Sequence, residues 1–286
     1  MNIRKDDNSP YLYYHNGRPC FEGRLPEDSH LGVGVYESMR VRKLNLSAGI
    51  LGLDMHLERL KRGAEFIGSR AFNLQKLRSN ITLAIKRFDW ESTTDALLRI
   101  VQYRHDDFLS LTSWKPTFDV NVGAALWPVG GLRAHPEYKS CSALTSVMAR
   151  QTAYEHGAGE ALLVDLEGIV KEGAWSNFFW VDGPGTVRTP RTGLLPGITR
   201  AIVIWLAGRE GSQVLEEDCS LETIMAEASE AFITQATHGL VGVVALGEHP
   251  IRFGEHASIT TRLRKRYESL FHADEKTFFS EFSIGD

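Results

Sequence analysis

One stretch near the middle of the chain, WPVGGLRAHPEY from Trp127 to Tyr138, most constrains how the protein can fold. It contains prolines and glycines and lacks the hydrophobic periodicity of a helix or a strand. Such a stretch is typical of a connection between domains, and 286 residues are enough for two domains with their own cores. We therefore predict an N-terminal domain over residues 1–126, a linker over 127–137 and a C-terminal domain over 138–286.

Short strand-like and helix-like patterns alternate on both sides of this linker. The N-terminal part opens with two strand patterns around an Asn16-Gly17 turn, and GVGVYESMRV is typical of a further strand. The segment LDMHLERLKRGAEFIG predicts an amphipathic helix with Leu53, Leu57 and Leu60 on one stripe. Further strands and helices are predicted at residues 160–173, 177–183, 193–211, 220–230, 230–247 and 259–271. This mixture predicts an α+β fold.

The composition argues against several classes of partner. The net charge of -4 is not accompanied by a block of basic residues, so nucleic acid is not an expected partner. The longest apolar run, AIVIWLAG, is too short to cross a membrane, and MNIRKDDNSP lacks the apolar region of a signal peptide. Cys20, Cys141 and Cys219 lie far apart and fit no zinc spacing, so no metal site is expected. These features predict a cytoplasmic protein with reduced thiols.

The segment EYKSCSALTSVMARQ, residues 137–151, places a lysine before a run of small and apolar residues. Leu144, Val147 and Met148 recur at helical spacing after Lys139, which predicts a helix that packs tightly at its first turn. A lysine carried into the interior by such a helix is costly to keep charged, so its pKa falls and it becomes a nucleophile. A lone lysine is more often a solvated surface residue, and the pattern alone leaves both roles open.

Three further features have chemistry that would suit such a lysine. Glu172, in KEGAWSNFFWV, is either a turn residue or an inward carboxylate that holds a proton on a heteroaromatic nitrogen. In LLPGITR, Gly197 offers bare N–H groups, and Ile198 and Thr199 open a helix whose positive end attracts phosphate; an ordinary Pro-Gly helix start has the same pattern. Arg59, in HLERL, either binds phosphate or pairs with its neighbours on a solvated helix face.

Together, in this order and spacing, these segments resemble the fold-type IV pyridoxal-phosphate (PLP) enzymes, the class IV aminotransferase family. The resemblance is strongest from Lys139 to Arg200 and extends weakly to GVGVYESMRV, LDMHLERL and FITQATHGLVGVV. The family includes branched-chain and D-amino acid transaminases, R-selective amine transaminases and aminodeoxychorismate lyase. The resemblance implies a D-amino acid aminotransferase-like fold, with a smaller N-terminal α/β domain and a larger C-terminal pseudo-barrel domain. It also implies bound PLP and a homodimer.

The resemblance implies roles for the residues that match the family pattern. Lys139 corresponds to the catalytic lysine, which forms a Schiff base with PLP and moves the α-proton, and Glu172 to the partner of the pyridine nitrogen. The remaining cofactor-binding positions are Arg59, Leu195, Gly197, Ile198, Thr199 and Thr237. The substrate-binding positions are Tyr36 and Arg104.

Departures from the family pattern bear on the substrate. Val33 stands where many relatives have an acid, Ser142 where they usually have asparagine, and Ala236 removes a hydroxyl group from the phosphate loop. The resemblance favours a PLP-dependent aminotransferase that acts on an amino acid or primary amine and a 2-oxo acid. The alternatives are 4-amino-4-deoxychorismate lyase, which releases pyruvate and 4-aminobenzoate, and a non-catalytic member that binds a ligand. The sequence leaves the native substrate and its stereochemistry open.

Overall fold

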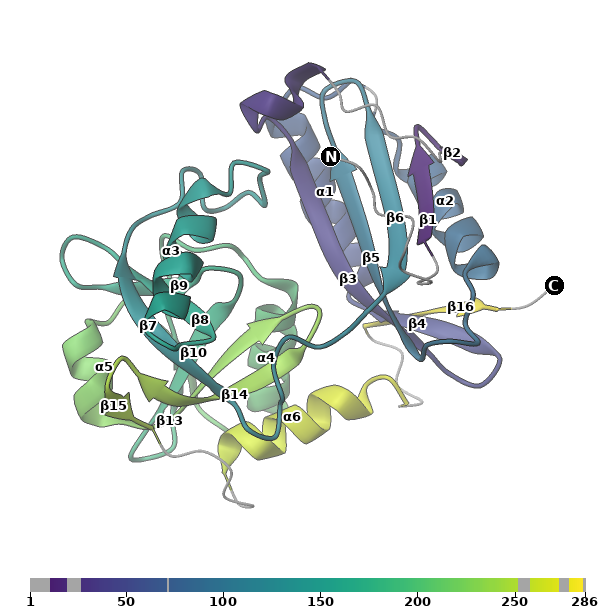
Figure 1. Cartoon of the computed structure of the whole chain (residues 1–286). Coiled ribbons are helices and arrows are strands. Elements are labelled where there is room, and N and C mark those ends of the chain that lie inside the picture. The colour runs from purple at the N-terminus through teal and green to yellow at the C-terminus, as the bar shows by residue number, and fades with distance from the viewer. Residues whose placement is uncertain (1–10, 20–26, 71, 252–257, 273–277, 285–286) are drawn as a thin grey trace. The chain divides into compact units, whose positions relative to one another are not determined.

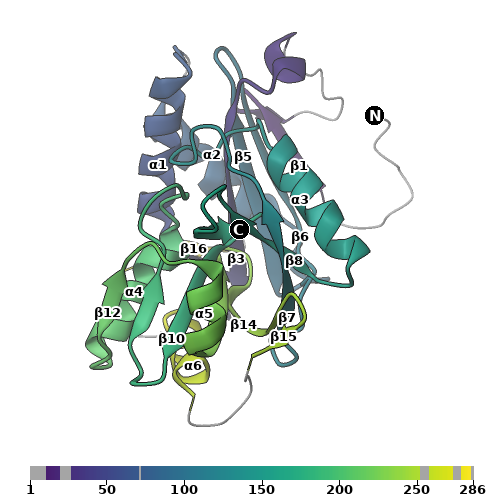
Figure 2. The same ribbon diagram turned by 90° about the vertical axis from the view of Figure 1, so that its left-hand side faces the viewer.

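Figures 1 and 2 show the chain in two views. The computed structural model describes residues 11–19, 27–70, 72–251, 258–272 and 278–284. Cys20, which the sequence predicts to be a reduced thiol, lies outside these residues, and Cys219 is a free cysteine. Within the described ranges, no helix combines the length and the apolar composition that a bilayer crossing requires.

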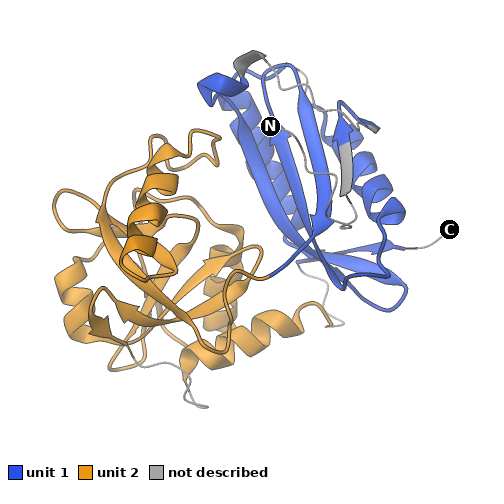
Figure 3. Ribbon diagram, viewed as in Figure 1, with its two compact units in different colours: residues 1–115, 277–286 blue, residues 116–276 orange. Residues whose placement is uncertain are grey.

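The chain divides into two compact units (Figure 3). Unit 1 comprises residues 1–115 and 277–286, and unit 2 comprises residues 116–276. The division therefore lies earlier than the linker predicted at 127–137, because the start of that stretch belongs to strand β7 (Ala124–Gly130) in the sheet of unit 2. The predicted C-terminal domain also loses its last residues, because strand β16 pairs with a strand of unit 1.

Unit 1 is a seven-stranded antiparallel sheet with two helices on one face (Figure 1). Its strands follow the order β16-β4-β3-β5-β6-β1-β2. The elements are β1 (Tyr11–His15), β2 (Arg18–Pro19), the 3-10 helix η1 (Glu27–Leu31), β3 (Val35–Lys43), β4 (Ser47–Leu51), α1 (Leu53–Phe66), α2 (Leu74–Arg87), β5 (Asp95–Gln102), β6 (Asp107–Ser113) and β16 (Phe279–Ser283). The predicted amphipathic helix is confirmed as α1, whose Leu53, Leu57 and Leu60 are buried in the core between helices and sheet.

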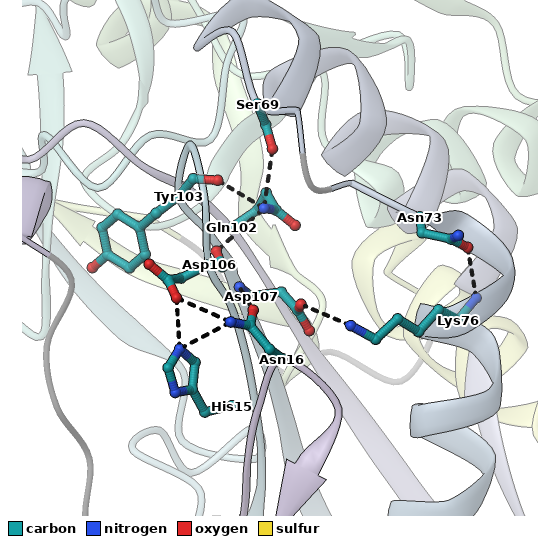
Figure 4. A network of polar contacts seen from close by, with 9 residues as sticks. All are labelled: His15, Asn16, Ser69, Asn73, Lys76, Gln102, Tyr103, Asp106 and Asp107. Atoms are coloured by element: carbon teal, nitrogen blue, oxygen red, sulfur yellow. Dashed lines mark hydrogen bonds and ion pairs between the residues drawn. The ribbon is translucent and has the colours of Figure 1, made fainter.

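Polar side chains join two hairpin turns at one end of this sheet (Figure 4). The predicted Asn16-Gly17 hairpin is confirmed, since both residues have positive φ, 49° and 75°, and β1 pairs with β2. Asn16 Nδ2 donates to Asp106 Oδ1 at 3.0 Å, and the backbone N of Asp107 donates to Asn16 Oδ1 at 2.9 Å. These bonds tie the β1–β2 turn to the turn between β5 and β6.

Unit 2 is built on a nine-stranded sheet with the order β12-β11-β10-β13-β14-β7-β8-β9, in which β15 also pairs with β14. Its elements are β7, α3 (Leu144–Glu155), β8 (Glu160–Val164), β9 (Val170–Gly173), β10 (Asn177–Asp182), β11 (Val187–Thr189), α4 (Ile198–Arg209), β12 (Val214–Glu216), α5 (Leu221–Glu227), β13 (Ala228–Gln235), β14 (Gly239–Leu246), β15 (His249–Pro250) and α6 (Ile259–Ser269). Strand β9 ends this order yet lies against β10, so the sheet curls back on itself. Phe178, Trp180 and Ile233 belong to the apolar cluster of this sheet. The predicted pseudo-barrel is confirmed.

Helix α3 packs on β7 and β8 through small residues. Ala149 and Ala153 share one buried cluster with Ala161 and Leu163 of β8. Because alanine has little bulk, this contact lets the helix lie close to the sheet. The close packing fixes the position of the chain that enters α3 from β7, and this segment contains Lys139.

The prediction for the helix after Lys139 is wrong in two respects. Helix α3 begins at Leu144, so Lys139 lies in a non-helical segment and not in the first turn of a helix. The residues expected to face the interior, Leu144, Val147 and Met148, are 73%, 51% and 56% exposed. The alanine face competes for the same sheet surface and packs more closely, which leaves the larger apolar side chains on the outside.

Candidate active site

The N-terminus of helix α4 lies against Asn177, the first residue of β10. Gly197 is the N-cap residue, and as a glycine it has no side chain that could cap the first N–H groups of the helix. A Cβ atom at Gly197 would clash with Asn177 Oδ1, so the approach requires glycine. Ile198 and Thr199 follow in the first turn, and both are buried. The partial positive charge of this helix end therefore suits an anion such as phosphate.

Glu172 lies on β9, is 3% exposed, and has donors on both carboxylate oxygens. Oε1 accepts from Arg133 Nε at 2.8 Å and from Arg133 Nη2 at 2.7 Å. Oε2 accepts from the backbone N of Leu195 at 3.0 Å and, more weakly, from Asn177 Nδ2 at 3.5 Å. Asn177 Nδ2 also donates to the carbonyl of Leu195 at 2.8 Å. Strands β9 and β10 and the segment before α4 thus meet at one carboxylate.

Lys139 belongs to the same electrostatic environment. It is half-buried in the segment between β7 and α3, and its positive charge acts on Glu172. Burial raises the pKa of Glu172 above its ordinary value, and Arg133, the N–H of Leu195 and Lys139 offset this rise only in part. A protonated ring nitrogen placed beside this carboxylate would favour its ionised form, because opposite charges stabilise each other where water is excluded.

Two buried hydroxyl groups flank Asn177 and have no hydrogen-bond partner among the described residues. Ser176 Oγ belongs to the preceding residue, and Thr234 Oγ1 belongs to the residue opposite Asn177 on β13. A buried polar group left unpaired costs about 1–3 kcal/mol, so these hydroxyl groups favour a polar ligand. PLP needs an acid for its ring nitrogen, an amine for its aldehyde and an anion site for its phosphate. Glu172, Lys139 and the α4 N-terminus fit these needs.

Thr237 lies in the turn between β13 and β14. Its hydroxyl donates to Gln235 Oε1 at 3.0 Å and contacts His238 Nδ1 at 3.0 Å. Because a hydroxyl has one proton to donate, Thr237 would have to release Gln235 in order to donate to a phosphate. Its cofactor-binding role stays a prediction.

Arg59 and Tyr36 belong to unit 1. Arg59 lies on α1, is 6% exposed, and donates from Nε and Nη2 to the two carboxylate oxygens of Glu37 at 2.7 and 2.8 Å. His56 Nδ1 donates to Glu37 Oε2 at 2.7 Å, since an ionised carboxylate can only accept. Arg59 is therefore not on a solvated helix face. Tyr36 precedes Glu37 on β3, and its side chain points to the opposite face of the sheet.

Arg104 is exposed in the turn between β5 and β6. Its Nε donates to the carbonyl of Ile67, at the end of α1, at 3.2 Å. Gln102 Nε2 donates to the carbonyls of Tyr103 and Asp106 at 2.7 and 3.2 Å and so braces the turn from inside (Figure 4). The turn is well supported, and the role of Arg104 in substrate binding stays a prediction.

Sequence reasoning missed Arg133 and Asn177. Arg133 falls in the segment that the prolines and glycines mark as a linker, where an arginine has no pattern to distinguish it. Asn177 was overlooked because it opens an apolar strand, yet it is 5% exposed. A polar residue directly before the apolar run from Phe178 to Val181 is the one signal that the sequence offers for Asn177, because buried amides need hydrogen-bond partners. Both residues bind Glu172.

Comparison with known proteins gives a family match over most of the chain. The family described as amino-transferase class IV matches residues 34–246. A branched-chain-amino-acid aminotransferase from Pseudomonas aeruginosa is 25% identical over 272 residues, which cover 86% of each chain. A protein from Methanocaldococcus jannaschii, provisionally named a branched-chain-amino-acid aminotransferase, is 36% identical over 153 residues, 53% of this chain and 52% of the relative. The match thus spans about half the length of that second relative.

Solved structures with the same fold are also found. The branched-chain aminotransferase from Thermoproteus uzoniensis, crystallised with norvaline, superposes with a TM-score of 0.86 at 23% identity and covers 95% of this chain and 99% of that one. The T.th. branched-chain amino acid aminotransferase, complexed with N-(5'-phosphopyridoxyl)-L-glutamate, gives a TM-score of 0.84 at 22% identity, with 94% and 97% coverage. At these identities the likeness establishes the fold.

Proposed function

Because this chain belongs to the amino-transferase class IV family, we propose that it transfers the amino group between a branched-chain amino acid and a 2-oxo acid. Family membership confirms the predicted family, the fold class and a PLP-dependent aminotransferase. The named relatives act on branched-chain amino acids, and they support the same substrate class for this protein.

The proposal rests on the buried carboxylate of Glu172. The positive charge of Lys139 acts to lower the pKa of this carboxylate, which also accepts a hydrogen bond from Leu195 in the segment before α4. When bound, PLP supplies an electron sink for the charge left at the substrate α-carbon. Glu172 would hold the proton on the ring nitrogen and so deepen that sink. Lys139 Nζ would take the proton from the α-carbon as a general base and return it as a general acid.

The remaining predicted residues have positioning roles in this proposal. The N–H groups of Ile198 and Thr199, at the start of α4, would hold the phosphate, and Gly197 lets that helix end approach Asn177. Leu195 would contact the ring while its backbone N–H fixes Glu172. Arg59 would add a second phosphate contact, and its orientation is already set by Glu37.

The test uses purified protein saturated with PLP and supplied with leucine, isoleucine or valine together with 2-oxoglutarate. We expect glutamate and the branched 2-oxo acid to form in equal amounts. A parallel reaction with aminodeoxychorismate is assayed for pyruvate. Pyruvate release without amino transfer would assign the lyase reaction instead. A protein that turns over neither substrate and does not change the visible absorbance of PLP would be a non-catalytic member.

We also propose that the protein is a homodimer that associates through helix α3. Leu144, Val147, Met148 and Tyr154 are each at least 50% exposed and recur at helical spacing. A row of large apolar side chains on a helix surface is typical of an interface, because its burial on association releases water. The same residues from a second copy would supply an apolar partner of matching chemistry.

Analytical ultracentrifugation tests the dimer. Val147→Glu should shift the protein to monomer, because a carboxylate in an apolar interface must be desolvated without a partner. Leu166→Glu is the matched control, since Leu166 is fully exposed in the turn between β8 and β9. An unchanged dimer in Val147→Glu would rule out the α3 face as the contact.

The cytoplasmic location predicted from the sequence is likewise a proposal. Cys219 is a free cysteine, as expected for a protein in a reducing compartment. Cell fractionation with an antibody against the protein would test it, and recovery in a secreted or membrane fraction would contradict it.

A further inference from the structure

Arg133 connects two parts of the candidate site that are far apart in the sequence. Its Nε and Nη2 groups donate to Glu172 Oε1 at 2.8 and 2.7 Å. The same Nη2 donates to the carbonyl of Pro136 at 2.8 Å, and Nη1 reaches the carbonyl of Tyr138 at 3.5 Å. Lys139 follows Tyr138 directly. One guanidinium group therefore contacts both the carboxylate and the segment that carries the amine.

The segment between Arg133 and Lys139 contains a strained turn. His135 has φ of 49°, in the left-handed region that residues other than glycine seldom adopt. The backbone N of Tyr138 donates to the carbonyl of His135 at 3.0 Å and closes the turn. Such a conformation persists only where its surroundings hold it, and the bond from Arg133 to Pro136 provides this support from inside the turn.

Arg133 also decides how the carboxylate of Glu172 is oriented. An ionised carboxylate oxygen has about two acceptor positions. Both positions on Oε1 are used by Arg133, whereas Oε2 has one good donor, the N–H of Leu195, and a weak contact at 3.5 Å with Asn177. The acceptor capacity left for a ring nitrogen is therefore on Oε2.

On the basis of the proposed function, we propose that Arg133 is a positioning residue for the PLP reaction. It holds the carboxylate of Glu172 and the backbone before Lys139 together. The distance between the carboxylate, which would bind the ring nitrogen, and the amine of Lys139, which would move the proton, therefore stays constant. The opposite role would be that of a blocking group, which leaves Glu172 when PLP binds. Its bonds to two backbone carbonyls and its 13% exposed side chain favour a fixed Arg133.

The first test compares Arg133→Gln with Arg209→Gln, an exposed arginine at the far end of α4. We expect Arg133→Gln to lower kcat on the order of 10²-fold, because small misplacements of reacting groups have effects of this size. KM should stay near its wild-type value, since the proposal gives Arg133 no contact with the substrate. The visible absorbance band of bound PLP should shift in the same direction as in Glu172→Gln. Arg209→Gln should change none of these.

The conservative variant Arg133→Lys separates charge from geometry and provides a second variant if Arg133→Gln folds poorly. Lysine keeps the positive charge but lacks the planar pair of donors that grips Glu172 and the turn together. It should therefore restore the absorbance band while recovering only part of kcat. Full recovery of kcat by lysine would show that charge alone matters and would overturn the positioning role.

A double-mutant cycle shows whether Arg133 acts through Glu172. The kcat and the PLP dissociation constant are measured for Arg133→Gln, Glu172→Gln and the double variant. If Arg133 acts through Glu172 as well as through the backbone before Lys139, the loss of kcat in the double variant is smaller than the product of the two single losses. Independent, multiplying losses would overturn the proposal, and so would tighter PLP binding by Arg133→Gln, which a blocking group predicts. The PLP dissociation constants are measured without turnover, so this test remains valid even if the protein does not act on branched-chain amino acids.

Discussion

The buried ion cluster of unit 1 gives a prediction whose size follows from the structure. Glu37 has no exposed surface, and its two oxygens accept from Arg59 Nε, Arg59 Nη2 and His56 Nδ1 at 2.7, 2.8 and 2.7 Å. Glu37→Gln keeps the volume but replaces one acceptor oxygen with an N–H donor. That donor would face either the guanidinium or the imidazole, and the buried Arg59 would lose the ionised carboxylate of Glu37.

The lowered pKa of Glu37 gives the size of the expected loss of stability. Burial by itself would raise this pKa, but the charges and hydrogen bonds of Arg59 and His56 outweigh burial and lower it from 4.5 to about 2. A lowered pKa in the folded state stabilises that state above pH 4.5, and this contribution is lost as the pH falls toward 2. A shift of this size corresponds to about 3 kcal/mol at pH 7 and about 1 kcal/mol at pH 3. Removal of one partner of a buried ion pair costs about 3–5 kcal/mol, which agrees.

Urea unfolding followed by circular dichroism at pH 7, 5 and 3 would measure the effect. We expect the free energy of unfolding of Glu37→Gln to be about 3 kcal/mol below that of the wild type at pH 7 and pH 5. The difference should narrow at pH 3, where Glu37 of the unfolded wild type is mostly protonated. Glu58→Gln, on the exposed face of α1, is the matched control and should change stability by only about 0.5 kcal/mol.

Hydrogen exchange of the α1 amides at pH 7 would locate the loss in unit 1. A loss below about 1 kcal/mol at pH 7, on the order of a single ordinary hydrogen bond, would refute the reasoning, because removal of one partner of a buried ion pair costs more than that. A difference in the free energy of unfolding between wild type and variant that is equal at pH 7 and pH 3 would also refute the reasoning.

Three other predictions concern unit 2. The Lys139→Ala variant should still bind PLP through the α4 N-terminus, but its turnover should fall on the order of 10³-fold. Replacement of the exposed Lys265 with alanine should leave turnover unchanged. Absorbance titration measures PLP binding, and initial rates measure turnover. Burial raises the pKa of Glu160 to about 7, so wild-type stability should fall between pH 4.5 and 7, by up to about 3 kcal/mol, and Glu160→Gln should abolish this fall in urea unfolding. Gly197→Ala should lower stability by about 1–3 kcal/mol and weaken PLP binding, because its Cβ would clash with Asn177 Oδ1; thermal unfolding and PLP titration measure these changes.

Local patterns in the sequence determined several elements correctly. The stripe of Leu53, Leu57 and Leu60 predicts α1, because helical periodicity is a property of neighbouring residues. The Asn16-Gly17 turn is equally local, since both residues tolerate positive φ. The order of Lys139, Glu172 and the α4 start, taken with the family resemblance, was enough to indicate the class of enzyme and its cofactor.

The α3 segment shows where local reasoning fails. Its sequence carries two stripes, one of alanines and one of larger apolar residues, and helical spacing does not say which one faces the sheet. The alanine stripe faces the sheet because Ala161 and Leu163 of β8 leave room for a close contact. The large apolar side chains therefore remain on the surface. The helix begins at Leu144, later than the sequence predicts.

The sequence by itself determined the short elements, the fold class and the residue types of the site, because each depends on neighbours along the chain. Tertiary structure alone decided which charges meet. The ion pairs Glu37–Arg59 and Arg133–Glu172 join segments that are distant in the sequence. Each buried charge pairs with the residue that the folded sheet places beside it. Tertiary structure also returned the last strand to unit 1, because β16 forms its backbone hydrogen bonds with β4 at the edge of that sheet. Such pairings leave no periodic trace in the sequence.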